Sequence, residues 1–251
     1  AATLICGLLP AVEASRRDSA EALKEGARGA SPGVRQRRIL SGLVTLQFAC
    51  AVVLLASGLL LIRSFAKAMG TDPGFRSDHV VSIATSLPVS GYPDGPAVRG
   101  FYNALLDRVA AIPGAAAVGA STDLPLTVRD RRAFTIENPS PAALSLPQAV
   151  ANEYVMGRYF EALGARIVRG RALSDADTVG SEPVVVINET LATRYWPGED
   201  AVGRRIAWGG ARTHLPWMRV VGIVGDTKQS GLTGITEPQT WSPWSQIPDS
   251  T

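Results

Sequence analysis

The chain has 251 residues, a formal net charge of +3 and two cysteines, Cys6 and Cys50. The excess positive charge belongs to residues 1–38, with seven basic and four acidic side chains, whereas residues 39–251 carry 18 of each. Such a basic arm favours contact with anionic lipid head groups or an acidic partner. No basic stripe interleaved with aromatic residues follows, which argues against nucleic-acid binding. Two cysteines in apolar stretches provide neither a disulfide framework nor a metal framework.

The chain opens on twelve largely apolar residues, AATLICGLLPAV, which are too few to cross a bilayer. We interpret them as the end of a preceding membrane helix, and the alternative is an anchor that lies in the membrane interface. Residues 13–26 then combine charged and apolar side chains and predict a short helix that ends at Gly26.

Residues 39–62, ILSGLVTLQFACAVVLLASGLLLI, form an uncharged run of 24 residues, 14 of them Leu, Ile, Val or Phe. As a helix this run would be about 36 Å long, enough to cross a hydrocarbon core of about 30 Å. The alternatives are a buried core helix or a signal peptide. A core helix of this length normally contains charge, and a signal peptide is shorter and lies at the start of a chain. The run therefore predicts a transmembrane helix.

The distribution of basic residues predicts the orientation of this helix. Seven basic residues precede it, whereas only Arg63 and Lys67 follow closely. Basic residues remain preferentially on the cytoplasmic side, so residues 1–38 are expected in the cytoplasm and everything after about Met69 outside it.

A strand–helix–strand unit is expected after the membrane helix. Residues 63–69 prolong the helix, and GTDPG at 70–74 breaks it. Residues 79–87 alternate and are rich in β-branched side chains, which predicts a strand. Residues 96–112 begin with Pro and place apolar side chains on one face, which predicts a helix, and residues 115–121 are expected to form the second strand.

The rest of the chain predicts further short elements of both kinds. Its alternating and β-branched runs predict strands, and its periodic runs closed by Gly or Pro-Gly predict helices. The expected strands are residues 133–137, 148–155, 184–188 and 217–224, and the expected helices are residues 156–163 and 189–195. No terminal element is expected after Thr236.

The sequence provides no catalytic, cofactor-binding or metal-binding residues. Lys228 lies in GDTKQSG, which lacks the spacing of a phosphate-binding loop, so the chain is not expected to hydrolyse ATP. His79 and His214 are too scattered to indicate a metal site or a catalytic triad. Asp175 and Asp177 could hold a cation, but the 12-residue calcium-loop pattern is absent and a solvated turn is favoured.

Two further features have ordinary structural interpretations. Asn188-Glu189-Thr190 matches a glycosylation triplet, a pattern that arises often by chance. The four tryptophans from Trp208 onward could line an apolar surface, although tryptophan more often fills a core or covers a loop.

The order of these segments resembles the MacB/FtsX-like permeases of ATP-binding-cassette (ABC) transporters, and most closely the large bacterial members with duplicated permease halves. The similar segments cover nearly the whole chain in the family's order. They are LLPAVEASRRDSAEALKEGARG, RRILSGLVTLQFACAVVLLASGLLLIRSF, DPGFRSDHVVSIATSLP, FYNALLDRVAAIPGAAAVGASTDLPL, EYVMGRYFEALGARIVRGRAL, VVVINETLATRYWPGEDAVGRRI and VVGIVGDTKQSGL.

The resemblance implies an α+β fold and three parts of the chain. Residues 1–38 would be the end of a preceding membrane helix with a cytoplasmic linker, residues 39–69 a transmembrane helix, and residues 70–251 a periplasmic core domain. In the family this domain has two lobes, one of them like the porter domains of efflux pumps and built from strand–helix–strand units. The chain would lie in a bacterial inner membrane.

The resemblance also implies a function and partners. The chain would be a non-enzymatic permease segment of an ABC-type exporter whose outer domain transmits ATP-driven motion. Its partners would be a cytoplasmic ABC ATPase subunit or domain, membrane lipid, a periplasmic adaptor with an outer-membrane channel, and a second copy or permease half. The alternative is a membrane-anchored binding or regulatory module that activates a partner, as in FtsX-like proteins. A complete permease half has three more membrane helices after the core domain, so the chain is expected to be a fragment or a truncated reading frame.

Overall fold

The structure is a computed structural model, and it describes residues 34–247 apart from residues 89, 128–129, 211–215, 229–230 and 232–233. The chain divides into two compact units between Lys67 and Ala68. The expected helix at 13–26 and the residues Cys6 and His214 lie outside the described residues.

Helix α3 contains the predicted membrane span. It runs over Val34–Met69, 36 residues, so it includes both the apolar run and its expected extension to Met69. Its segment Arg37–Met69 is long and apolar enough to cross a membrane. Apolar side chains such as Phe48 and Leu55 are 73% and 74% exposed, which suits a lipid environment.

The second unit is built on one mixed sheet of eight strands. The strands are β1 (Gly119–Ser121), β2 (Arg131–Ile136), β3 (Ala149–Gly157), β4 (Ile167–Gly170), β5 (Val184–Asn188), β6 (Arg205–Trp208), β7 (Met218–Val224) and β8 (Gln239–Pro243). The described helices of this unit are α4 (Gly95–Ala110), α5 (Pro141–Leu144), α6 (Tyr159–Ala162), α7 (Glu189–Tyr195) and the 3-10 helix η1 (Trp244–Gln246).

The sheet closes on itself. Its hydrogen-bonded order is β1-β3-β2-β6-β7-β5-β8, and β3 also pairs with β8. The six strands β3, β2, β6, β7, β5 and β8 therefore form a ring. Two of the pairings are parallel, β3 with β8 and β5 with β7, and the other pairings are antiparallel. Strands β1 and β4 lie off the ring, each against part of a ring strand. Closure leaves the ring strands with no free edge between them.

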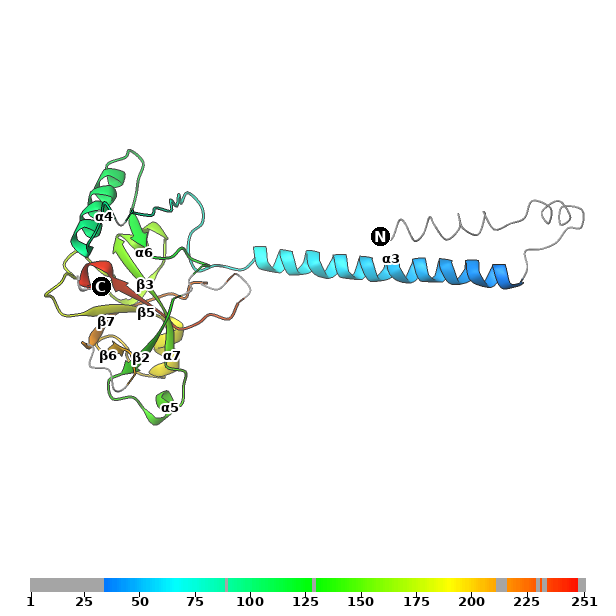
Figure 1. The fold of residues 1–251 in the computed structure, drawn as a ribbon. Coiled ribbons are helices and arrows are strands. Elements are labelled where there is room, and N and C mark those ends of the chain that lie inside the picture. Colours follow the sequence, from blue (N-terminus) through cyan, green and yellow to red (C-terminus); the bar gives the residue numbers. More distant parts are fainter. Residues whose placement is uncertain are drawn as a thin grey trace, which may run out of the picture. The chain divides into compact units, whose positions relative to one another are not determined.

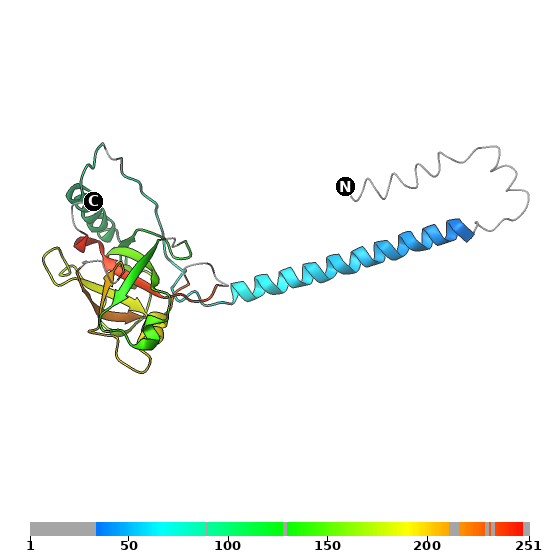
Figure 2. The ribbon, with the colours of Figure 1, turned by 60° about the horizontal axis from the view of Figure 1, so that its bottom comes forward.

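Two hydrophobic clusters stabilise this ring. One contains Phe134, Val185 and Ile187 together with Leu191 of α7, and the other contains Val186 and Trp241 together with residues of α6. Because successive side chains of a strand point to opposite faces, β5 supplies both clusters, and all five of its residues are buried. Helices α5 and α7 lie at one end of this unit and α4 at the other (Figures 1 and 2).

Helices α4, α5 and α7 begin at side chains that accept from a free backbone N–H group. The Asp94 carboxylate accepts from Ala97 N at 2.8 Å at the start of α4, which also has Pro in its first turn. Asn188 does the same for α7, accepting from Leu191 N at 3.0 Å. These are the helices that the sequence predicts most closely, at residues 96–112 and 189–195.

The expected fold class, an apolar helix followed by a mixed α/β domain, is confirmed. Strands expected at 133–137, 148–155, 184–188 and 217–224 correspond to β2, β3, β5 and β7. All strands of the described residues belong to a single sheet.

The prediction of a strand at residues 79–87 is wrong. These residues run without a strand partner among the described residues, and His79 has a φ of +62°. Val81 and Ile83 are 87% and 78% exposed. A strand needs a neighbouring edge for its backbone hydrogen bonds, and β propensity alone does not provide one. The strand–helix–strand unit therefore lacks its first strand in the described chain.

Two other expected elements are shorter than predicted, and three strands were not predicted. The strand at 115–121 forms only at β1, and the helix at 156–163 only at α6, because Met156 and Gly157 continue β3. Strands β4, β6 and β8 were missed, so the expectation of no element after Thr236 is wrong.

Candidate functional site

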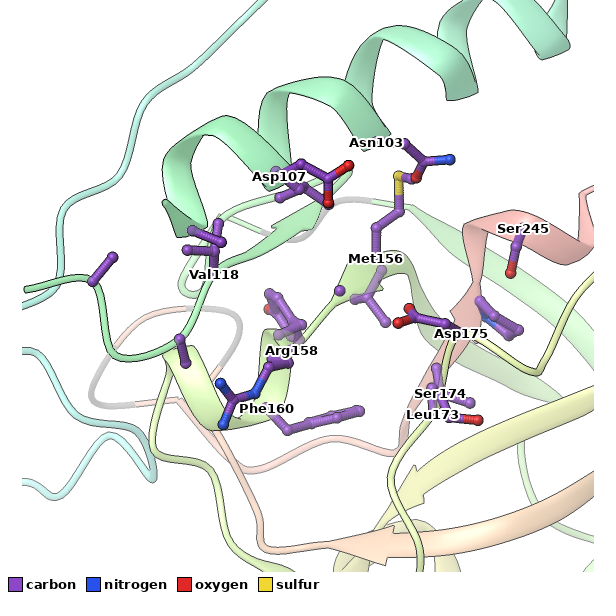
Figure 3. A pocket seen from close by; sticks show the side chains of 18 of the residues that line it. Asn103, Asp107, Val118, Met156, Arg158, Phe160, Leu173, Ser174, Asp175 and Ser245 are labelled. Atoms are coloured by element: carbon purple, nitrogen blue, oxygen red, sulfur yellow. The ribbon is translucent and has the colours of Figure 1, made fainter. Parts of the chain in front are cut away.

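A cleft of about 520 Å³ opens beside helix α4 and is the candidate functional site (Figure 3). One wall is α4 with residues 115–118, and the floor is the end of β3 with α6. The opposite wall is the loop 173–178 together with the end of β8 and Ser245 of η1. We call this space the α4 cleft. It joins segments that lie far apart in the sequence.

The floor of the α4 cleft is apolar and continuous with the core. Val155, Tyr159 and Phe160 lie beneath it as members of the second hydrophobic cluster, and none of them is more than 7% exposed. The rings of Tyr159 and Phe160 meet edge to face, 5.6 Å between centroids. Leu106 of α4 and Met156 add apolar surface above them.

Two glycines allow α6 and β1 to approach each other at this floor. A Cβ atom on Gly119 would lie 2.5 Å from the Cα atom of Tyr159, so no larger residue fits. Gly157 has a φ of +61°, which turns the chain from β3 into α6. The turn is fixed by Arg158 N, which donates to Val118 O at 2.8 Å.

An ion pair between the exposed Arg171 and the buried Asp177 shapes the loop wall. Arg171 donates to both carboxylate oxygens of Asp177, at 2.8 and 2.7 Å, and Ser174 N donates to Asp177 at 2.8 Å. Burial raises the pKa of the Asp177 carboxyl, but these donors and the Arg171 charge outweigh it, so the pKa lies below its ordinary value. The ionised carboxylate therefore holds the loop in place.

The rim of the α4 cleft carries two acidic side chains. Asp107 of α4 and Asp175 of the loop point toward the space between their walls (Figure 3). Both are exposed, and neither carboxylate has an ion-pair or hydrogen-bond partner within the described residues. The cation of the lining, Arg158, is already paired with Glu161 and donates to Ala116 O at 3.1 Å. The rim of the cleft thus presents two carboxylates without a partner among the described residues.

A buried carboxyl lies under this floor. Glu153 of β3 is 0% exposed and accepts from Ser121 Oγ at 2.8 Å, from Tyr159 OH at 2.9 Å and from Gln239 Nε2 at 2.7 Å. These donors belong to β1, α6 and β8, so one side chain ties three elements together. Tyr159 also lines the cleft, which connects the cleft surface to Glu153.

Burial without a paired cation controls the titration of this group. Desolvation raises the pKa of Glu153 to about 7, although its hydrogen bonds oppose that rise. The nearby Tyr159 hydroxyl has its own pKa raised by burial and by the Glu153 charge, so it stays a donor. The raised pKa therefore places the titration of the Glu153 carboxyl near neutral pH.

The residues weighed in the sequence for metal or catalytic chemistry are not brought together. His79 is exposed, and Asp175 and Asp177 play different roles, one on the cleft rim and one in the ion pair with Arg171. Within the described residues, no group of three or more His, Cys, Asp or Glu side chains could hold a metal ion.

The other singled-out residues have structural partners. Asn188 is 0% exposed and donates to Asp226 Oδ1 and Glu237 O, so the glycosylation triplet is not accessible in this fold. Lys228 Nζ donates to Gly234 O at 2.8 Å. Trp241 is a core residue, 1% exposed.

Sequence reasoning missed Glu153 and the cleft. A charged residue in the predicted strand at 148–155 was the available signal for Glu153, because a charge within a buried strand needs partners. The cleft itself depends on where loop 173–178 packs, and the sequence carries no local signal for that.

Comparison with known proteins finds similarity to MacB in the family models, the curated proteins and the solved structures. The model of the family described as MacB-like periplasmic core domain matches residues 49–251. A curated relative, the macrolide export ATP-binding/permease protein MacB of Aggregatibacter actinomycetemcomitans, is 30% identical over 98 residues. That match covers 39% of this chain and 14% of the relative, so the chain matches a small part of a much longer protein.

Solved structures with some similarity are also extracytoplasmic domains or parts of permeases. The periplasmic region of MacB from Actinobacillus actinomycetemcomitans has a TM-score of 0.39 at 18% identity, covering 58% of this chain and 56% of that one. The extracellular domain of the transporter YknZ from Gram-positive bacteria has a TM-score of 0.37 at 13% identity, with coverages of 55% and 60%. A domain of a putative permease from Porphyromonas gingivalis has a TM-score of 0.36 at 14% identity, with coverages of 52% and 52%.

Proposed function

Because this chain belongs to the MacB-like periplasmic core domain family, we propose that it is a permease segment of an ABC-type exporter. Its membrane helix would carry ATP-driven motion from the cytoplasm to the domain outside. The chain itself would have no enzymatic role, and ATP would be hydrolysed by a partner subunit or domain.

The observation that carries this proposal is the attachment of residues 73–76 to the domain. Pro73 O accepts from Lys228 N at 2.9 Å, and Arg76 N donates to Leu163 O at 2.7 Å. Between them Gly74 lies against the backbone of Asp226. The chain is therefore bound to the domain within a few residues after α3 ends at Met69.

Such a short junction suits mechanical transmission. A long flexible linker would absorb the movement of a helix, whereas a short segment held at both ends passes on tilt and displacement. The contacts reach two parts of the domain, the segment after β7 and the end of α6, so force would not depend on one hydrogen bond.

The proposed setting is a bacterial inner membrane, with the basic arm in the cytoplasm and the domain from about residue 70 in the periplasm. The proposed partners are the ABC ATPase, membrane lipid, and a second copy or a second permease half. An adaptor and an outer-membrane channel would complete the export path.

The experiment is to lengthen the junction in a complete permease that carries this segment. A flexible Gly/Ser insertion of about ten residues between Gly70 and Thr71 should leave expression and membrane insertion unchanged and abolish export. The matched control is the same insertion after Gly210, where a Cβ atom would meet nothing within 4 Å. Export at the unmodified rate with the lengthened junction would contradict the proposal.

The α4 cleft favours a second candidate, a membrane-anchored binding or regulatory module. In that case the domain would act through what the cleft binds, and the length of the junction would have no effect. The two candidates therefore predict opposite results in the same experiment.

A further inference from the structure

We propose that Glu153 makes the attachment of the junction at residues 73–76 depend on protons. The contacts of the junction are firm while the Glu153 carboxyl is protonated, and they loosen when it gives up its proton to solvent. This inference rests on the proposed function, because it describes how the proposed junction is regulated. It is carried by two hydrogen-bonded paths that lead from one buried carboxyl to the two hydrogen bonds of the junction.

The first path runs through α6. Tyr159, the first residue of this four-residue helix, donates to Glu153 at 2.9 Å. Leu163 N donates to Tyr159 O at 3.0 Å one turn later, and Leu163 O accepts from Arg76 N at 2.7 Å. Because α6 is a single turn, a displacement of Tyr159 reaches the junction contact of Arg76 directly.

The second path runs through β8. Gln239 Nε2 donates to Glu153 at 2.7 Å, and the oxygen of the same side-chain amide accepts from Thr227 Oγ1 at 3.3 Å. The next residue, Lys228, makes the other junction contact, in which its N–H donates to Pro73 O at 2.9 Å. Both contacts of the junction are therefore connected to the same carboxyl.

The network around Glu153 can bond in two protonation states. Ser121 Oγ and Tyr159 OH both lie within 2.9 Å of Glu153 Oε2, and a hydroxyl can accept as well as donate. The ionised carboxylate accepts from both hydroxyls, whereas the protonated carboxyl donates to one of them. The same heavy atoms bond in each state, but only the protonated state leaves the core without a charge.

No positive charge that faces Glu153 among the described residues favours its ionised state. From β8 come Gln239 and Trp241, which are neutral, and Trp241 lies opposite Glu153 in the ladder of β3 and β8. From α6 comes Tyr159, whose own raised pKa keeps it neutral. Burial is the main cause that raises the pKa of Glu153 to about 7, and the negative charge of Asp123, two residues after β1, adds to it.

Thermodynamic linkage gives the direction of the effect. An opening that lets water reach Glu153 returns its pKa toward the ordinary value of 4.5. The closed state therefore holds a proton that the open state has lost, and the ratio of open to closed chains rises with pH. The rise is up to about tenfold per pH unit between about pH 4.5 and 7, and it levels off above that.

The test measures hydrogen–deuterium exchange at the junction itself. The full chain is reconstituted in phosphatidylcholine nanodiscs, and exchange of single amides is followed by mass spectrometry from about pH 5 to about pH 8. Protection factors, which divide out the intrinsic pH dependence of exchange, are compared. Those of the Arg76 and Lys228 amides should fall by up to about tenfold per pH unit until about pH 7 and then stay constant.

Two further amides in the same data set separate a local opening from other events. The Val220 amide, in a fully buried residue of β7, donates to Arg204 O at 2.8 Å and reports unfolding of the whole domain. The junction amides should be less protected than it at every pH. The Leu144 amide donates to Ser140 O at 3.1 Å on the exposed α5, outside both paths, and its protection should not change with pH.

Three variants assign the effect to Glu153. Glu153→Gln cannot titrate, so the protection of the junction amides should become independent of pH. Glu199→Gln is the matched control, because it removes an exposed carboxylate of the same residue type outside both paths, and it should behave as wild type. Tyr159→Phe cuts only the first path, so the Arg76 amide should lose most of its pH dependence while the Lys228 amide keeps it.

The split between the two amides in Tyr159→Phe distinguishes a connection through α6 from a general loss of stability, which would change both. It is also the deciding result if Glu153→Gln does not fold. Equal pH dependence of both amides in Tyr159→Phe would overturn the proposal. So would junction protection that is independent of pH in the wild-type chain, or junction amides that are as protected as Val220 at every pH.

The two proposals can fail separately. The exchange measurement needs no ATP, cargo or partner, whereas the insertion between Gly70 and Thr71 tests export. A junction that responds to pH, in a permease whose export is indifferent to junction length, would contradict only the proposed function. A junction that ignores pH but whose lengthening abolishes export would contradict only this inference.

Discussion

At the scale of single residues, the buried carboxyl of Glu153 makes the stability of the domain depend on pH. It is fully buried and accepts three hydrogen bonds, but the donors are neutral, and no cation among the described residues pairs with it. Desolvation raises the pKa of Glu153 to about 7 in the folded state, whereas its ordinary pKa is about 4.5. Between these pH values the folded state therefore holds a proton that the unfolded chain has already lost.

The free energy of unfolding should therefore decrease as pH rises from about 4.5 to about 7 and show no further decrease from this group above that. The native state binds the extra proton in this window, so the total decrease from Glu153 is about 3 kcal/mol. Glu153→Gln should remove this dependence while keeping a hydrogen-bonding side chain. Urea unfolding is followed by tryptophan fluorescence at several pH values in a non-ionic detergent. It gives the difference in the free energy of unfolding between the wild-type chain and Glu153→Gln. A difference that does not change with pH would show that Glu153 does not titrate in this range.

The role of Glu153 was only partly predictable from the sequence. The segment AVANEYV places a charge inside a predicted strand, and that much is local information. Its partner Gln239 lies 86 residues further along, in a strand that was not predicted. Without the closure of the sheet between β3 and β8, nothing in the sequence brings the two side chains together.

At the scale of elements, the junction after α3 depends on a glycine. Gly74 has a φ of +77°, and a Cβ atom there would lie 2.0 Å from the carbonyl oxygen of Asp226. Any side chain would both strain the backbone and push residues 73–76 away from the domain.

Gly74→Ala should therefore destabilise the domain by roughly 2–4 kcal/mol, the sum of backbone strain and steric overlap. Gly180→Ala is the matched control, since Gly180 has a φ of +98° but nothing within 4 Å of a Cβ atom. It should cost only about 1 kcal/mol, the strain alone. Thermal unfolding of the two variants measures the difference, and equal losses would mean that the approach to Asp226 is not tight.

Elements with strong local signals were predicted well. Helices α4 and α7 have capping side chains and Pro-Gly stops, and β5 is a compact β-branched run, so their sequences alone determine them. Strands β4, β6 and β8 are only four or five residues long and form because neighbouring strands offer an edge. Residues 79–87 show the opposite case, with strong propensity and no edge, and the prediction of a strand there failed.

At the scale of the whole molecule, the orientation in the membrane is a prediction that labelling can test. The side chain of Ala142 is exposed on α5 and takes no part in the helix cap. The neighbouring Ser140 caps α5 by accepting from Ala143 N, so it should be left intact. In a chain with Cys6 and Cys50 replaced by serine, Ala142→Cys should react with an impermeant maleimide on intact spheroplasts. A cysteine at Ala27 in the basic arm should react only after the membrane is opened. The reverse pattern would place the domain in the cytoplasm.

The family model matches residues 49–251, but the proposed mechanism depends on a junction whose contacts no local sequence pattern predicts. The sequence predicted a helix, a five-residue break and a folded domain. It did not predict that Pro73 and Arg76 would bond to Lys228 and Leu163, because those contacts join segments about 90 to 155 residues apart in the chain.

The central claim is that ATP-driven motion reaches the outer domain through this junction. The most direct measurement is the amount of cargo exported per ATP hydrolysed, in proteoliposomes that contain the complete permease and its ATPase. Lengthening the junction between Gly70 and Thr71 by about ten residues should leave ATP hydrolysis within about twofold of the unmodified protein and reduce export to background, because hydrolysis and movement are then separated. An unchanged ratio of export to hydrolysis in the lengthened protein would contradict the claim.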